Sequence, residues 1–526
     1  MLTESLKRLT PSPRELLLEA AELYDEGENC VLLKAPTGYG KTTLSLTIYD
    51  AIRSGWDAGI LLIHVLPLRS IGDDLYRKAV TRFYSVEPTG PSYIDIGVQH
   101  SYSPGAIALH RRFNITTLDT FILSFFKLPP FVLPKVIKDS SLGQYEVTRG
   151  LIYSSFLVFD EVHLYFQTPR SSSVFLSVLG ALGKARVPVL MTSATVPADV
   201  QSAVISAYGQ CRVIDRKPGD APERHVRVRT IREEDVVREV KEALDSGKSV
   251  AVVRNTVKEA VEDFERLRTL AKEAILVHGR LSEEDRLKAI KKVLGGKLRP
   301  GTLVVATQVI EAGVDISADL MVTSAAPPES LEQRMGRVAR YGGEGEFLVV
   351  EPGKSTAPYD RSEVEDGFMQ ARAMEEGKQA KFHYPIRGLT PATEVSRFLE
   401  MIEENPMASS REVNGLLKEV CSFVREDELV TVYPRELLDS RCERTARGYK
   451  CDGLNRLAVP LQRDSLKGDT LNYLVDVGGG EYVVVQDRAP GENRCFFSFH
   501  LKVDGKDVQP LGVIVEGYKE GIGLVG

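Results

Sequence analysis

The segment at residues 35–42, Ala-Pro-Thr-Gly-Tyr-Gly-Lys-Thr, has the residue types and spacing that phosphate chemistry needs. In such a loop the backbone N–H groups surround phosphate oxygens, the lysine approaches the β and γ oxygens, and the next hydroxyl faces Mg²⁺. Ala35 stands where the pattern has its first glycine, so we expect the loop to begin in a less permissive conformation. The predicted nucleotide ligands are Thr37, Gly38, Gly40, Lys41, Thr42 and Thr43.

Two adjacent carboxylates follow in the segment Asp-Glu-Val-His at residues 160–163. We expect Asp160 to hold Mg²⁺ together with Thr42, through water because Mg²⁺ keeps much of its hydration shell. Glu161 is the candidate for orienting or deprotonating an attacking water. A solvated acidic turn is the alternative for this pair, and the phosphate loop upstream favours the catalytic interpretation.

A third segment, Gln-Arg-Met-Gly-Arg-Val-Ala-Arg at residues 333–340, could supply positive charge to the same reaction. Hydrolysis of a γ-phosphate depends mainly on position and charge, and arginine fingers stabilise its transition state. Arg337 and Arg340 are one helical turn apart by spacing, so we predict that both reach one partner, with Gln333 in the same catalytic set. The alternative is an ordinary salt-bridged helix face.

The elements that position these segments follow from the hydrophobic pattern. Apolar runs of strand type alternate with helical patterns through the first two thirds of the chain, which predicts βαβ units and parallel sheets. Residues 30–33 and 156–159 are predicted strands that end at the phosphate loop and at the carboxylates, because ligands gather at the carboxyl ends of parallel strands. A second set of predicted strands comprises residues 249–253, 274–277, 302–306 and 320–323.

Composition changes along the chain predict three domains. A polar stretch at residues 212–234 places one boundary near residue 220, and the pattern changes again near residue 390. We therefore expect a domain at 1–220 with the phosphate loop and carboxylates, a domain at 221–390 with the arginines, and an accessory domain at 391–526. The last should contain helices at 394–404 and 410–426, followed by valine-rich and aromatic runs separated by Gly and Asp.

Length and composition indicate a globular chain with several cores. It has 526 residues, 43% of them hydrophobic and 27% charged, with a formal net charge of −6. This charge excludes binding nucleic acid by bulk charge but allows a local basic groove. The six cysteines form no C-x-x-C pair and the first residues lack an apolar signal core, so we expect a reduced, cytoplasmic protein without a structural metal. The longest apolar stretch, residues 60–68, is too short for a membrane span, and no membrane association is predicted.

Nucleic-acid contacts are predicted at hydroxyls and cations beside the strand ends. Such groups suit phosphate contacts, which position a strand without reading its bases. For each of them, capping or another structural role is an open alternative. The candidates are Arg69, Thr116, Thr117, Arg254, Thr256, His278 and Thr307.

In this order the segments resemble superfamily 2 helicases with a DEVH box and, more narrowly, the CRISPR-associated interference helicases of type I systems. The narrower resemblance depends on residues 115–120 (Ile-Thr-Thr-Leu-Asp-Thr), 252–257 (Val-Val-Arg-Asn-Thr-Val) and 306–316 (Ala-Thr-Gln-Val-Ile-Glu-Ala-Gly-Val-Asp-Ile). It covers about residues 12–345. It implies an α/β fold with two tandem RecA-like parallel-sheet domains, followed by a C-terminal α+β accessory domain.

The same resemblance implies ATP-dependent 3′-to-5′ translocation on single-stranded DNA, in antiviral defence, after a crRNA-guided surveillance complex has opened the target. ATP and Mg²⁺ would bind between the two sheet domains, and the γ-phosphate would favour their closure. Asp315 would contact the ATP ribose or couple the domains, while Ser193 and Thr195 would link hydrolysis to strand binding.

Two departures from the family pattern matter for function. None of the eight histidines is followed by Asp, so we expect a separate HD nuclease subunit and no intrinsic cleavage. Residues 11–15, Pro-Ser-Pro-Arg-Glu, stand where related helicases have an adenine-reading glutamine, which leaves ATP against GTP open.

Two other functions compete with this one. A DEVH helicase of DNA repair or RNA metabolism is one alternative. A nucleotide-gated clamp without turnover is disfavoured because Lys41, Glu161, Arg337 and Arg340 are all present.

Overall fold

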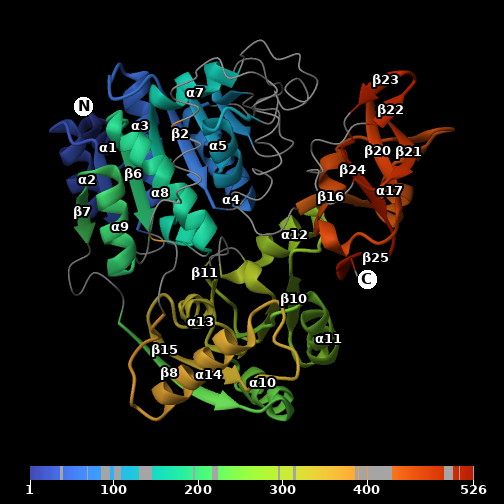
Figure 1. Cartoon of the computed structure of the whole chain (residues 1–526). Helices are drawn as coiled ribbons and strands as arrows, with labels where there is room; N and C mark the ends of the chain where they lie inside the picture. Colours follow the sequence, from blue (N-terminus) through green and yellow to red (C-terminus); the bar gives the residue numbers. More distant parts are fainter. Residues whose placement is uncertain are drawn as a thin grey trace. The chain divides into compact units, whose positions relative to one another are not determined.

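The computed structural model places the chain in two compact units (Figure 1). The first contains mainly Met1–Ala221, and the second contains Pro222–Pro385, Leu429–Glu492 and Phe499–Gly526. The structure describes residues 1–35, 39–67, 69–84, 95–99, 108–129, 145–166, 168–193, 196–215, 223–293, 296–311, 316–384, 389, 400, 429–490, 501–508 and 510–524. None of the helices in these ranges is both long and apolar enough to cross a bilayer.

A seven-stranded parallel sheet forms the centre of the first unit, in the order β3-β4-β2-β5-β6-β1-β7. Its strands are β1 (Cys30–Lys34), β2 (Leu61–Leu66), β3 (Ile96–Gln99), β4 (Phe113–Thr117), β5 (Ser155–Phe159), β6 (Val189–Ser193) and β7 (Arg212–Asp215). The central strands are buried on both faces, which explains their unbroken apolar runs. The predicted strands before the phosphate loop and the carboxylates are confirmed as β1 and β5.

Helices cover both faces of this sheet and make two separate cores. One core takes side chains from α1 (Leu2–Leu9), α2 (Glu15–Asp25), α3 (Lys41–Arg53) and α4 (Arg69–Phe83). The other takes them from α5 (Leu118–Phe125), α7 (Tyr145–Tyr153), α8 (Pro169–Lys184) and α9 (Ala198–Tyr208), with the 3₁₀ turn η2 (Val162–Phe166). Helices therefore pack on both faces of the sheet at the strand ends that lead into the phosphate loop.

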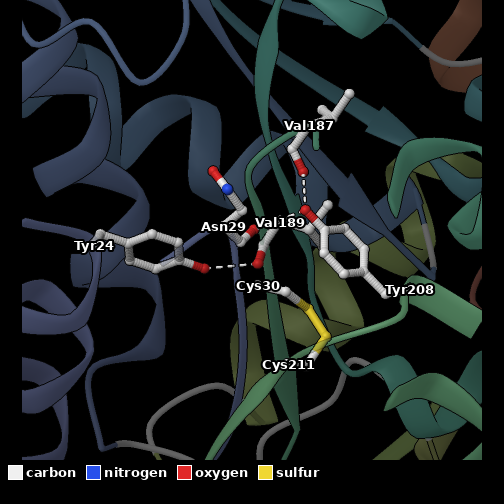
Figure 2. The surroundings of a disulfide bond; sticks show 7 residues. All are labelled: Tyr24, Asn29, Cys30, Val187, Val189, Tyr208 and Cys211. Atoms are coloured by element: carbon white, nitrogen blue, oxygen red, sulfur yellow. Dashed lines mark hydrogen bonds between the residues drawn. A yellow bond between two sulfur atoms is a disulfide. The ribbon is translucent and has the colours of Figure 1, made fainter. Parts of the chain in front are cut away.

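A disulfide in this unit joins Cys30, the first residue of β1, to Cys211, the residue before β7 (Figure 2). Their Cα atoms are 4.6 Å apart. A second disulfide joins Cys442 and Cys451. The prediction that these four cysteines are reduced thiols is therefore wrong. The Cys30–Cys211 pairing could not be read from the sequence, because parallel strands bring together residues that are distant along the chain.

The second unit contains a six-stranded parallel sheet in the order β10-β12-β9-β14-β15-β8. Its strands are β8 (Arg224–Ile231), β9 (Val250–Val253), β10 (Glu273–Val277), β12 (Thr302–Ala306), β14 (Leu320–Ser324) and β15 (Gly343–Val350). Helices α12 (Glu283–Val293), α13 (Pro328–Met335) and α14 (Arg361–Glu375) pack against one core, and α10 (Val236–Asp245) and α11 (Val257–Leu267) against the other. The four strands predicted in this region are confirmed.

Residues 429–524 form a smaller module that belongs to the same unit. Its mainly antiparallel sheet has the order β17-β18-β21-β20-β24-β16-β19. The strands are β16 (Leu429–Pro434), β17 (Glu443–Arg444), β18 (Gly448–Lys450), β19 (Val459–Gln462), β20 (Thr470–Gly478), β21 (Glu481–Arg488) and β24 (Gly512–Val515), with helix α17 (Arg435–Arg441). Two parallel-sheet α/β domains followed by an α+β module confirm the predicted fold class. The helices predicted at 394–404 and 410–426 lie outside the described residues.

Candidate nucleotide-binding site

The phosphate loop leaves β1 at Lys34 and enters α3 at Lys41. The Ala35 N–H donates to the Ser193 carbonyl at 2.9 Å, and Ala35 is not among the residues with positive φ, so alanine fits here without left-handed strain. Gly40 has a φ of 98°, and a Cβ there would lie 3.1 Å from Leu17 Cδ1, so this position requires glycine. Thr37 and Gly38 lie outside the described residues, whereas Lys41, Thr42 and Thr43 form the first turn of α3, where helix N–H groups favour anions.

The predicted phosphate-binding lysine and the predicted base contact each other. Lys41 Nζ donates to Glu161 Oε1 at 2.7 Å, and the lysine side chain is almost fully buried. Glu161 has a φ of 48°, an uncommon conformation for a non-glycine residue that aims its side chain at the loop. Its other oxygen is 3.4 Å from His163 Nδ1, which in turn is 2.7 Å from Ser193 Oγ. A polar chain thus joins Lys41 to the end of β6.

The surroundings of Asp160, at the carboxyl end of β5, favour its ionised form. It accepts hydrogen bonds from the Thr192 hydroxyl and, at 3.0 Å, from the Glu161 N–H. Burial raises the pKa of Asp160, but His64, whose Nε2 is 3.9 Å from the carboxylate, the charge of Lys41 and the Thr192 bond together hold this pKa well below its usual range. The carboxylate is therefore ionised, as a metal ligand must be.

The residues at this site fit Mg²⁺ better than a metal held only by protein. Among the described residues no group of three or more His, Cys, Asp or Glu side chains could hold a metal ion. One ionised carboxylate, Asp160, and one hydroxyl, Thr42, are the donors that Mg²⁺ uses when it keeps several waters and shares substrate phosphates. A bound Mg²⁺ would neutralise phosphate charge here.

The arginine segment does not continue the helix before it. Helix α13 ends at Met335, Val338 pairs with Ala318, and Ala339 has a φ of 46°. The prediction that Arg337 and Arg340 share one helical turn is therefore wrong, because the chain leaves the helix before both of them.

Some polar atoms of residues 333–340 have hydrogen-bond partners and others do not. Arg337 donates to the Glu311 carbonyl at 2.7 Å, and the Arg340 N–H donates to Ser317 Oγ at 2.9 Å. In contrast, Gln333 Oε1 and Arg337 Nε are buried without a hydrogen-bond partner. An unpaired buried N–H donor is expensive unless a ligand serves it, so Arg337 Nε suits contact with a phosphate oxygen. Gln333 Oε1 is an acceptor and needs a donor such as water instead.

Matches to known families cover most of the first sheet domain and part of the second. Residues 18–203 match the DEAD/DEAH box helicase family, and residues 246–343 match the C-terminal part of the CRISPR-associated nuclease/helicase Cas3. The CRISPR-associated helicase Cas3 of Thermoproteus tenax is 28% identical over 353 residues, which are 65% of this chain and 59% of that protein. The Streptococcus thermophilus CRISPR-associated nuclease/helicase Cas3 is 24% identical over 402 residues, 65% of this chain and 42% of that protein.

Two segments of the chain therefore resemble the helicase domains of Cas3 proteins. A solved structure of T. fusca Cas3 with AMPPNP has a TM-score of 0.61 at 17% identity, covering 88% of this chain and 66% of that one, and it shows the same fold. The present chain spans about half the length of the relatives that it matches.

Several predicted nucleic-acid residues have other partners. Buried Arg254 donates to Asp263 at 2.5 Å and to Glu233 at 2.7 Å. Thr256 caps α11 in a capping box with Glu259, so its hydroxyl has the capping role that was the open alternative. A phosphate would have to displace these bonds or use backbone groups.

The remaining candidates are placed as follows. Thr116 donates to the Gln99 carbonyl at 2.8 Å, Thr117 donates to Thr120 at 3.2 Å, and Thr307 is buried before the 3₁₀ turn at Gln308–Ile310. The buried His278 ring is 2.7 Å from the Ile522 carbonyl of the C-terminal module. Arg69 begins α4, but its side chain, like Asp315, Ala194 and Thr195, lies outside the described residues. Their roles in strand binding stay predictions.

Two further buried groups, one in each unit, were missed by sequence reasoning. His64 lies buried in β2 between Ser45 Oγ, at 2.9 Å, and the Asp160 carboxylate, at 3.9 Å. Its signal was a polar residue inside an apolar strand. Arg334 lies fully buried beside Glu311, and the only feature of the sequence that pointed to it was its place in the segment 333–340.

Proposed function

We propose that this chain is an ATP-dependent 3′-to-5′ single-stranded DNA translocase that acts in type I CRISPR interference. The observation that carries the proposal is the contact of Lys41 with Glu161 beside ionised Asp160, at the carboxyl ends of β1 and β5. A lysine, a carboxylate base and a metal-binding carboxylate are the parts that γ-phosphate hydrolysis requires. The helicase and Cas3 family matches support the choice of a nucleic-acid motor.

ATP binding would begin by changing the partner of Lys41. The phosphates would take the ammonium group from Glu161, which leaves that carboxylate free to orient or deprotonate a water. Thr42 and Asp160 would hold Mg²⁺. Gln333, Arg337 and Arg340 would stabilise the charge that develops on the γ-phosphate, and Asp315 would contact the ribose or couple the two sheet domains.

The proposed partners follow from the same function. Single-stranded DNA is the track, a crRNA-guided surveillance complex exposes it, and a separate HD nuclease subunit cuts it. The Streptococcus thermophilus relative is a nuclease/helicase by name, so both activities occur in proteins of this kind.

The test measures ATP hydrolysis with and without single-stranded DNA and with RNA of matched length. We expect DNA to stimulate turnover more than RNA, and Lys41→Ala to abolish turnover by removing phosphate binding. Duplexes with a 3′ or a 5′ single-stranded tail then report direction, and only the 3′-tailed duplex should be unwound. Stronger stimulation by RNA would favour the RNA helicase alternative, and full turnover in Lys41→Ala would remove the proposed function.

A further inference from the structure

Arg334 is a fully buried cation whose guanidinium joins the ends of three strands. It lies on α13 and donates to Glu311 Oε1 at 2.8 Å, to Thr323 Oγ1 at 2.8 Å and to Asn255 Oδ1 at 3.1 Å. Asn255 follows β9, Glu311 follows β12 and its 3₁₀ turn, and Thr323 belongs to β14. The Ser324 carbonyl, at 3.2 Å, and the Tyr359 hydroxyl, at 3.4 Å, complete the shell.

Arginine is required here by geometry as well as by charge. A buried cation costs several kcal/mol unless it is paired and its donors are satisfied. The planar guanidinium has donors in a fixed fork, whereas a lysine ammonium is a compact point charge that reaches fewer of these partners at once. Because well-packed apolar residues usually stabilise such a position equally well, the ionic network indicates a role beyond stability.

The network leads directly to a predicted arginine finger. The Glu311 side chain is held by Arg334, and the Glu311 backbone carbonyl accepts the bond from Arg337 at 2.7 Å. Asn255 is fixed in turn, because its side chain donates to the Ala325 carbonyl and its own carbonyl accepts from Gln308, both at 2.8 Å. Moving Arg334 would therefore move the group on which Arg337 rests.

We propose that Arg334 is a positioning residue that holds Arg337 in its catalytic orientation through Glu311. The inference rests on the proposed function, because it needs Arg337 to act during ATP hydrolysis. Arg334 itself touches no phosphate in this scheme. Its effect should therefore appear in kcat and depend on the presence of Arg337.

The test is a double-mutant cycle with Arg334→Lys, Arg337→Ala and the double variant. With Arg337 present, Arg334→Lys should lower kcat about tenfold with little change in the KM for ATP, and in the Arg337→Ala background it should lower kcat by less than about twofold. Arg372→Lys, at an exposed position of α14, is the matched control and should leave kcat unchanged. Equal losses in both backgrounds would overturn the inference, because they would indicate a purely structural role.

A gentler variant covers the case in which Arg334→Lys does not fold. Thr323→Val removes one acceptor of the guanidinium and should lower kcat about threefold, again only when Arg337 is present. An additive effect of Thr323→Val would overturn the inference.

Failure of the inference is distinguishable from failure of the proposed function. If Arg337→Ala leaves kcat unchanged while Lys41→Ala abolishes it, the inference fails and the ATPase function stands. If Lys41→Ala retains turnover, both fail.

Discussion

At the scale of single residues, the site is arranged so that its charged groups restrain one another until a ligand arrives. Lys41 neutralises Glu161, and burial with polar contacts keeps Asp160 ionised. The left-handed backbone of Glu161 is the strained feature of this arrangement, and such strain occurs mostly at functional sites. The nucleotide therefore has to compete with an internal ion pair.

Replacing Glu161 separates nucleotide binding from hydrolysis. In Glu161→Gln we expect ATP affinity to be kept or increased, because the phosphates no longer compete with a carboxylate for Lys41. Turnover should fall at least about 100-fold, since the base is lost. Fluorescent-nucleotide titration and steady-state hydrolysis measure the two effects, with Glu365→Gln on the surface of α14 as the control. Parental turnover in Glu161→Gln would show that another group activates water.

At the scale of elements, the strand that carries the phosphate loop is fixed by bonds to its neighbours. The Cys30–Cys211 disulfide joins β1 to β7, while Tyr24 donates to the Val189 carbonyl of β6 at 2.6 Å and Tyr208 to the Val187 carbonyl at 2.8 Å (Figure 2). The disulfide and a further Tyr208 bond to the Asn29 carbonyl, at 3.3 Å, anchor the amino-terminal end of β1, while the bonds to Val187 and Val189 hold the neighbouring β6.

Removing this disulfide should destabilise the first unit. Its cysteines are 181 residues apart, so the chain-entropy argument gives about 5 kcal/mol for Cys211→Ala. Trp56, the only tryptophan, lies in this unit beside Phe156 and makes urea unfolding visible by fluorescence. Cys451→Ala, whose pair is 9 residues apart in the other unit, should leave the Trp56 transition unchanged. An unaltered transition in Cys211→Ala would contradict this prediction.

The contact between the C-terminal module and the second sheet domain should weaken in acid. His278 Nδ1 accepts the Arg280 N–H at 3.1 Å, so the neutral ring must donate from Nε2 to the Ile522 carbonyl. Burial lowers the pKa of His278 to about 4, the Ile522 bond opposes this shift and the charge of Arg280 adds to it. Protonating Nδ1 would place two N–H groups against each other.

The direction of the pH effect follows from this lowered pKa. The unfolded state takes up a proton near pH 6.5 and the folded state only near pH 4, so the stabilisation is complete above pH 6.5 and is lost as pH falls toward 4. The loss amounts to at most about 3 kcal/mol. Hydrogen-exchange protection of the Leu524 amide, which donates to the Arg280 carbonyl, measures it.

Two variants test this assignment. His278→Asn should remove the pH dependence of Leu524 protection, because asparagine does not titrate in this range. His225→Asn, at an exposed position, should preserve it. The same dependence in His278→Asn would show that another group titrates.

At the scale of the whole molecule, we expect this chain to move on DNA without cutting it. None of its histidines precedes an aspartate, and the acidic residues of the described site fit a nucleotide-bound Mg²⁺. Incubation with single-stranded DNA and Mg²⁺, Mn²⁺ or Ni²⁺ should leave the DNA intact, and adding an HD nuclease subunit should produce cleavage. Cleavage by this chain alone, abolished by Asp160→Ala, would contradict the prediction.

Much of the architecture could be predicted because it depends on local patterns. Apolar runs at the residues of β1 and β5 marked strands buried on both faces, and glycine and lysine at fixed spacing marked a loop that receives phosphate. Thr256 was equally readable as a helix cap, because capping is decided by residues three positions apart. The end of α13 was not readable, since helical spacing alone does not show that the chain leaves the helix after Met335.

The sequence by itself determined the parallel sheets and the set of groups that a phosphate reaction needs. Only the tertiary structure decided which of these groups meet: Lys41 with Glu161, His64 with Asp160, Cys30 with Cys211, and Arg334 with Glu311. The physical reason is that partners in a parallel sheet are separated by whole βαβ units along the chain. Their approach is set by strand order and packing, which no local pattern records.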